Sequence, residues 1–178
     1  GSTDAPAVDV LADGGVLLNV DAQSKSLSNL SSENKKLIEK TFYKGRKFDI
    51  ISSQFVIHYL FGNKTSINNL VDNINTFLKK DGYILLTLFD GQTIHEKFGE
   101  NNKITSHYTD DEGQRTILYE IVKKYNIKTD SKLPKDVGQP IDVYMSWIME
   151  EGKYYKEYLV SKKLMIDTME KAGCRLVD

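Results

Sequence analysis

The sequence predicts an α/β protein with a partly parallel sheet, and two observations favour that class. Residues 48–89 combine two short apolar runs with apolar residues at helical spacing between them, which predicts a strand, a helix and a second strand. The second run, "YILLTLFD", is continuously apolar, as is typical of a strand buried on both faces of a parallel sheet. In such sheets ligands bind beyond the carboxyl ends of the strands, so residues that follow strands are candidates for a site.

The first half of the chain is expected to alternate strands and helices. Val8–Gly15 alternates apolar and polar residues and stops at a double glycine, which predicts a short strand and a loop. Ser32 is a suitable N-cap for a helix over Glu33–Phe42. The strand "KFDIISSQF" follows, and then a helix that we expect Thr65 to cap and "KKDG" to end.

The second half is less regular in its pattern. "IHEKF" predicts a short helix, and Thr105–Gln114 has the composition of a loop. Arg115–Val122 and Val143–Met149 are expected to be strands. The stretch "EYLVSKKLMIDTMEKAG" should begin extended and become a helix from about Ser161, and "CRLVD" should start another strand.

Composition excludes several classes of protein. The chain has 178 residues, of which 40% are hydrophobic and 28% charged, as in an ordinary globular domain. A net charge of -1 lacks the basic excess of proteins that hold long nucleic acids, so any RNA contact should involve one end or one base. A single cysteine, Cys174, leaves no internal disulfide and no cysteine-based zinc site, and favours a reducing compartment. No apolar run approaches the ~20 residues of a membrane helix.

Polar side chains follow the ends of three expected strands. Asp13 follows the first, Gln54 with His58 and Tyr59 the second, and Asp90 the third. Each has a simpler interpretation: Asp13 and Asp90 precede glycine and suit turns, and a lone histidine is more often a core or surface residue. By the same reasoning His95 and His107 are interpreted as surface residues and Trp147 as a core residue. What favours a binding site is that the ends of these three expected strands should lie close together at one edge of the sheet.

Three stretches together resemble one family. Gln54-Phe55-x-x-His58-Tyr59 at a strand end, Ala12-Asp13 upstream, and Glu157 followed by an aromatic and aliphatics downstream are similar to the messenger-RNA cap guanine-N7 methyltransferases. The likeness is greatest to the methyltransferase domain of large-DNA-virus capping enzymes. It implies a Rossmann-like class I sheet and S-adenosylmethionine as the cofactor. Its partners would be the capped 5′ end of mRNA and other capping-enzyme domains or a regulatory subunit, with no membrane and no metal.

The resemblance also implies a role for each candidate residue. Asp13, Gln54 and Tyr59 would contact the cofactor, with Asp13 accepting from the adenine amino group. His58, Glu157 and Tyr59 would contact the cap. No residue is expected to act as an acid or a base, because guanine N7 already carries a lone pair and the enzyme need only position its substrates.

The sequence departs from the family pattern at both ends. No glycine-rich loop of the type Asp-x-Gly-x-Gly precedes Asp13, so residues 1–178 are expected to be a partial domain from strand three onward, incomplete at its carboxyl end as well. Residues 1–7 would be a tag remnant or a disordered leader. The missing loop supports one alternative, a non-catalytic methyltransferase-like subunit that binds or stabilises a capping partner. A methyltransferase of the same fold acting on a small molecule is a further alternative, against which the family-specific spacing argues. The expected location is cytoplasm or nucleus, or, for a viral protein, the host cytoplasm or the virion.

Overall fold

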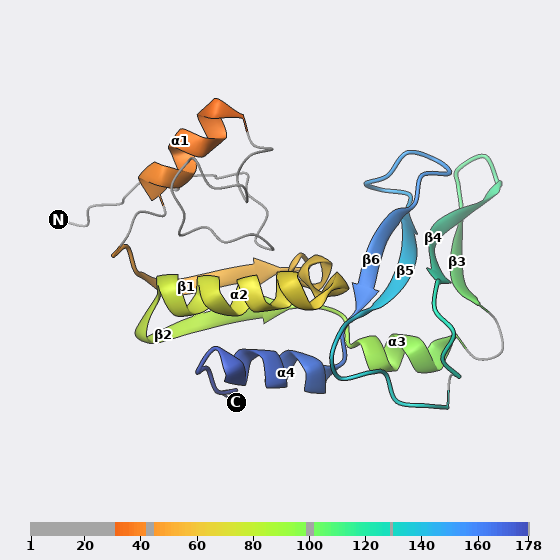
Figure 1. The fold of residues 1–178 in the computed structure, drawn as a ribbon. Helices are drawn as coiled ribbons and strands as arrows, with labels where there is room; N and C mark the ends of the chain where they lie inside the picture. Colours follow the sequence, from red (N-terminus) through yellow and green to blue (C-terminus); the bar gives the residue numbers. More distant parts are fainter. Residues whose placement is uncertain (1–30, 42–44, 99–101, 129, 178) are drawn as a thin grey trace.

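A computed structural model describes residues 31–41, 45–98, 102–128 and 130–177 (Figure 1). The elements in chain order are α1 (Ser32–Thr41), β1 (Phe48–Gln54), the 3-10 helix η2 (Ile57–Gly62), α2 (Lys64–Phe77), β2 (Leu78–Thr87), α3 (Gly91–Lys97), β3 (Lys103–Thr109), β4 (Arg115–Lys123), β5 (Gln139–Met145), β6 (Tyr155–Leu159) and α4 (Lys162–Lys171). The expected strand over 8–15, and Asp13 with it, lies outside the described residues. The α/β class is confirmed.

The strands form two sheets. β1 and β2 are a parallel pair, and β3, β4, β5 and β6 form an antiparallel sheet in that order. Figure 1 shows the parallel pair with α2 and α4 in one part of the molecule and the antiparallel sheet with α3 in the other. The parallel register runs from Ile50 opposite Tyr83 to Gln54 opposite Thr87, so both strands end at the same edge.

One face of the parallel pair is packed and the other is open. Ile84 and Leu86 of β2 pack against a core that α2 and α4 share through Ile67, Ile74, Leu164, Met165 and Met169. On the opposite face Ile50, Tyr83 and Leu85 are 55%, 60% and 51% exposed. The expectation that β2 is buried on both faces is therefore wrong for the described part of the chain, because no described element packs on its second face.

The ends of α2 differ from the sequence expectation. Asn63, not Thr65, is the N-cap, and its side chain accepts a hydrogen bond from Ser66 N at 2.9 Å. The helix ends at Phe77, and Lys79 already belongs to β2, where it pairs with Asp49 of β1 at 2.7 Å. The "KKDG" segment is therefore strand rather than helix end, and Lys79 finds its partner on the neighbouring strand.

The antiparallel sheet corrects two further expectations. Thr105–Thr109, expected as loop, belongs to β3 and pairs with β4. β5 ends at Met145, and the amides of Ile148 and Met149 turn back to the Met145 carbonyl, so the expected strand to Met149 is too long. Trp147 lies in that turn and is 59% exposed, so its assignment to the core is wrong.

The regions around α3 and α4 give mixed outcomes. Ser161 caps α4 as expected, accepting from Leu164 N at 3.2 Å, but the described residues after α4 form no strand. Asp90 is the N-cap of α3 rather than a simple turn residue. His95 is fully buried, with Nδ1 2.6 Å from the Tyr125 hydroxyl and Nε2 3.0 Å from the Lys128 carbonyl, so its assignment to the surface is wrong. His107 is exposed, as expected.

Candidate active site

A carboxylate, a phenol and an imidazole meet where η2 approaches β6. The Tyr59 hydroxyl donates a hydrogen bond to Glu157 Oε1 at 2.7 Å. His58 Nε2 lies 3.1 Å from Glu157 Oε2. The two partners of Glu157 are adjacent in η2, whereas Glu157 lies 98 residues beyond Tyr59 in the chain. The sequence analysis placed Glu157 at the start of its strand, but in the structure it lies in the middle of β6.

The end of β1 explains how η2 presents these side chains. Phe55 has a φ of 54°, a left-handed conformation that is costly for a residue with a side chain, and its amide still bonds the Thr87 carbonyl at 2.8 Å. The chain therefore turns sharply as it leaves the sheet. The turn then buries Ile57 and Phe61 in η2, which leaves His58 mostly buried and Tyr59 42% exposed.

The negative charge of the cluster lies on the Glu157 carboxylate. Burial alone would raise the pKa of this carboxyl, but the contacts with His58 and Tyr59 outweigh it and the pKa lies below its usual value. Burial and the hydrogen bond to Glu157 raise the pKa of Tyr59, so the phenol stays protonated and acts as a donor. His58 Nε2 is buried without a hydrogen bond of good geometry, so we describe its approach to Glu157 as an electrostatic contact.

Gln54 lies at the carboxyl end of β1, but its side chain makes its hydrogen bonds to residues of the parallel sheet. Its amide nitrogen donates to Ser52 Oγ at 3.1 Å and to the Leu85 carbonyl at 3.3 Å, and its amide oxygen accepts from the Thr87 hydroxyl. These partners belong to the exposed face of β1 and β2. The structure therefore brings together Glu157, His58 and Tyr59, while Gln54 makes its described hydrogen bonds elsewhere.

Two exposed aromatic side chains pair at the carboxyl edge of the parallel sheet, and the sequence analysis noted only one of them. Phe55 and Phe89 have ring centroids 5.3 Å apart and are 50% and 59% exposed. Phe55 belongs to the motif noted in the sequence analysis, whereas its near neighbour Ile57 points into the core. The position of Phe89, two residues after the end of a strand that pairs with Gln54, was the signal that could have identified it.

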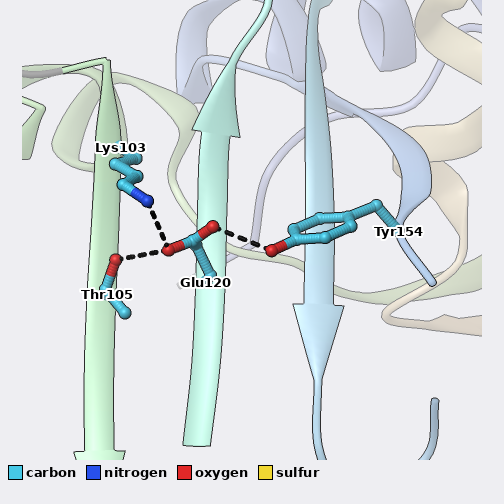
Figure 2. A network of polar contacts seen from close by, with 4 residues as sticks. All are labelled: Lys103, Thr105, Glu120 and Tyr154. Carbon is cyan, nitrogen blue, oxygen red and sulfur yellow. Dashed lines mark hydrogen bonds and ion pairs between the residues drawn. The ribbon is translucent and has the colours of Figure 1, made fainter. Parts of the chain in front are cut away.

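A second polar cluster lies on the antiparallel sheet (Figure 2). Glu120 of β4 is 6% exposed, and its Oε2 accepts from Lys103 Nζ at 3.0 Å and from the Thr105 hydroxyl at 2.8 Å. The Tyr154 hydroxyl donates to Oε1 at 2.8 Å. The sequence analysis gave no sign of this cluster, because its members are polar residues of β3, of β4 and of the segment before β6, which are separate in the chain. Both oxygens have partners within the protein, so the cluster connects β3 and β4 to the residue before β6.

The described residues hold no cluster of histidine, cysteine, aspartate and glutamate suited to a metal ion. They also hold no helix long and apolar enough to span a membrane. The site is thus a charged carboxylate with two donors beside it, at the end of a parallel β–α–β unit. Such a site can bind a ring that carries adjacent N–H groups.

Comparison with known proteins gives the class and then the family. The site and the parallel unit suit a methyltransferase, and residues 15–177 match the family model of the mRNA (guanine-N(7))-methyltransferase domain. The chain belongs to that family. This confirms the resemblance noted in the sequence.

Named relatives agree with this family. The chain is 40% identical over 174 residues to a probable mRNA-capping enzyme of Acanthamoeba polyphaga mimivirus, covering 97% of this chain and 14% of the relative. It is 26% identical over 154 residues to mRNA-capping enzymes of African swine fever virus isolates, covering 84% of this chain and 17% of theirs. The chain thus corresponds to a small part of these proteins.

A solved structure is also similar. An S-adenosylmethionine-dependent methyltransferase from Clostridium acetobutylicum aligns with a TM-score of 0.45 and 14% sequence identity, covering 84% of this chain and 63% of that one.

Proposed function

We propose that the protein methylates N7 of the cap guanine of mRNA, with S-adenosylmethionine as the methyl donor. The observation that carries this proposal is the charged Glu157 carboxylate, held by Tyr59 and His58 in a chain of the cap methyltransferase family. Guanine presents N1–H and an exocyclic amine side by side, and a carboxylate accepts from both. Adenine presents no such pair of donors, so the carboxylate also selects the base.

The reaction needs positioning more than proton transfer. The N7 lone pair attacks the methyl carbon in line with the carbon–sulfur bond, which breaks and leaves its electron pair on sulfur. The positive charge of the sulfonium passes to the guanine ring. Holding both partners in line can supply roughly 7–11 kcal/mol of the barrier. The negative charge of Glu157 would stabilise the charge that develops on the ring.

The remaining roles belong to the same proposal. His58, which lies against Glu157 at the same site, would contact the cap. Tyr59 would border cap and cofactor. Gln54 would contact S-adenosylmethionine from the carboxyl end of β1, where parallel sheets bind ligands, and Asp13 would accept from the adenine amino group.

We further propose that the capped 5′ end of mRNA and other domains of a capping enzyme are its partners. The mimivirus and African swine fever virus relatives, which are named mRNA-capping enzymes, support this view. The same relatives favour the cytoplasm of a host cell as its location. No observation favours the non-catalytic alternative.

Replacing Glu157 tests the proposal. Glu157→Ala should lower methyl transfer to a guanosine cap far more than it lowers S-adenosylmethionine affinity. Each lost bond to a charged group is worth about 1.5–3 kcal/mol, which corresponds to roughly a 10- to 100-fold loss in rate per bond. Glu157→Gln should be intermediate, because one acceptor survives without the charge. Glu151→Ala, an exposed carboxylate in the segment before β6, is the matched control. Near wild-type methylation by Glu157→Ala would show that the carboxylate is a surface charge.

A further inference from the structure

Tyr158, the residue after Glu157 in β6, packs against two glycines. A Cβ atom on Gly62 would lie 2.4 Å from Cζ, 2.6 Å from the hydroxyl oxygen and 2.7 Å from Cε2 of Tyr158. A Cβ atom on Gly138 would lie 2.8 Å from Tyr158 Cβ. Carbon atoms pack best at about 3.5–4.0 Å. The two glycines therefore leave the space that Tyr158 occupies, Gly62 at the tip of the ring and Gly138 at its base.

The same contacts hold η2 against β6. Gly62 is the last residue of η2, and Gly138 directly precedes β5, the neighbour of β6. The Gly138 amide donates to the carbonyl of Phe61 at 2.8 Å, so the end of η2 is also bonded to the backbone beside the sheet. A side chain at Gly62 would act directly on the approach of the two elements that carry the candidate site.

We infer that Gly62 is a positioning residue: by leaving room for the Tyr158 ring, it sets the distance between the His58–Tyr59 turn and the Glu157 carboxylate. This inference rests on the proposed function of that carboxylate. Glu157 and Tyr158 are neighbours in one strand, so a shift of β6 against η2 that relieves Tyr158 also moves Glu157 relative to Tyr59.

The distances leave little tolerance for such a shift. Hydrogen bonds between hydroxyl and carboxylate oxygens span about 2.5–3.0 Å, and the Tyr59–Glu157 bond is 2.7 Å long. Relieving a contact of 2.4 Å to ordinary packing distance needs a movement of about 1 Å. If η2 and β6 separate by that much, the bond from Tyr59 to Glu157 breaks.

The test compares Gly62→Ala with a control glycine in the whole protein that contains this chain. For Gly62→Ala we expect kcat/KM on capped RNA to fall roughly 10- to 100-fold, as for a misplacement of about 1 Å. The Kd for S-adenosylmethionine should stay unchanged. Gly82→Ala is the control: its Cβ would also be crowded, 2.8 Å from the Asp49 carbonyl oxygen, but it lies toward the amino end of β2. Gly82→Ala should lower the stability of the protein. It should not lower kcat/KM on capped RNA while leaving the Kd for S-adenosylmethionine unchanged.

A second substitution tests whether the ring is the cause. Tyr158→Leu removes the three ring atoms that an alanine methyl would meet, so Gly62→Ala with Tyr158→Leu should recover kcat/KM to the level of Tyr158→Leu alone. Wild-type turnover by Gly62→Ala would overturn the inference, since it would mean that the ring simply rotates away. A double variant no better than Gly62→Ala would overturn it as well.

A readout independent of activity separates this inference from the proposed function. Loss of the Tyr59 hydrogen bond in Gly62→Ala should raise the titration midpoint of the Glu157 carboxyl, followed by NMR of labelled glutamate. If the midpoint rises while even Glu157→Ala methylates caps normally, the positioning role stands and the proposed function fails. If Glu157→Ala is inactive and Gly62→Ala changes neither midpoint nor turnover, the proposed function stands and the inference fails.

Discussion

The hydrogen bond from Tyr59 to Glu157 can be removed with little other change, because phenylalanine keeps the ring. In Tyr59→Phe we expect the pKa of Glu157 to rise toward its ordinary value, since a donor that favours the charged form is lost. A carboxyl with a lowered pKa stabilises the fold above its unfolded pKa, and that contribution disappears as pH falls through the folded pKa. NMR titration of Glu157 measures the shift. Tyr155→Phe, an exposed neighbour, is the control, and an unchanged midpoint in Tyr59→Phe would contradict the assignment.

The sequence selected candidate residues but did not show their contacts. The spacing of Gln54, His58 and Tyr59 after β1 and the family pattern at Glu157 were sufficient to select them. That Glu157 contacts both His58 and Tyr59 depends on packing between segments far apart in the chain, as does the role proposed for Gly62. Gln54 shows the limit most clearly, because its hydrogen bonds to Ser52, Leu85 and Thr87 follow from strand register and not from its motif.

At the scale of elements, the Glu120 cluster connects β3, β4 and the start of β6. Burial alone would raise the pKa of Glu120, but hydrogen bonds from Thr105, Lys103 and Tyr154 lower it below the usual value. Glu120→Gln should therefore destabilise the protein by about 1–3 kcal/mol at neutral pH, because the charged partner of three donors is lost. Tyr154→Phe, which removes one bond, should cost less.

Denaturation at several pH values checks this prediction. The stability difference between wild type and Glu120→Gln should shrink as pH falls through the folded pKa of Glu120, because wild type then also loses the charge. Glu112→Gln, an exposed carboxylate in the turn between β3 and β4, is the control. A difference that does not depend on pH would mean that the charge is not what holds these strands.

Helices were easier to predict than strands, for a physical reason. α2 and α4 bury residues at steps of three and four, a local pattern, and their positions agree with expectation to within a few residues. β3 was missed because "TSHYT" is polar and becomes a strand only by pairing with β4. Trp147 was misplaced because nothing local shows that β5 ends before it.

At the scale of the whole molecule, the parallel pair leaves one of its faces open in the described chain. Ile50, Tyr83 and Leu85 expose most of their surface on one face. Parallel sheets are stable chiefly when both faces are covered, so this open face is suited to packing against further structure. Gln54, proposed to contact the cofactor, lies at the end of the same face, beside Thr87.

The 178-residue chain by itself should therefore bind S-adenosylmethionine weakly or not at all. The family pattern noted in the sequence includes a glycine-rich loop of the type Asp-x-Gly-x-Gly, which does not occur in the 178 residues. What the described part offers is Gln54 and the exposed Phe55–Phe89 pair, too few contacts to enclose a ligand of that size. Calorimetric titration of the chain, with the whole protein as the positive control, measures the difference. Tight binding to the 178-residue chain would contradict the proposal that it is a partial domain, and would place a complete cofactor site within these residues.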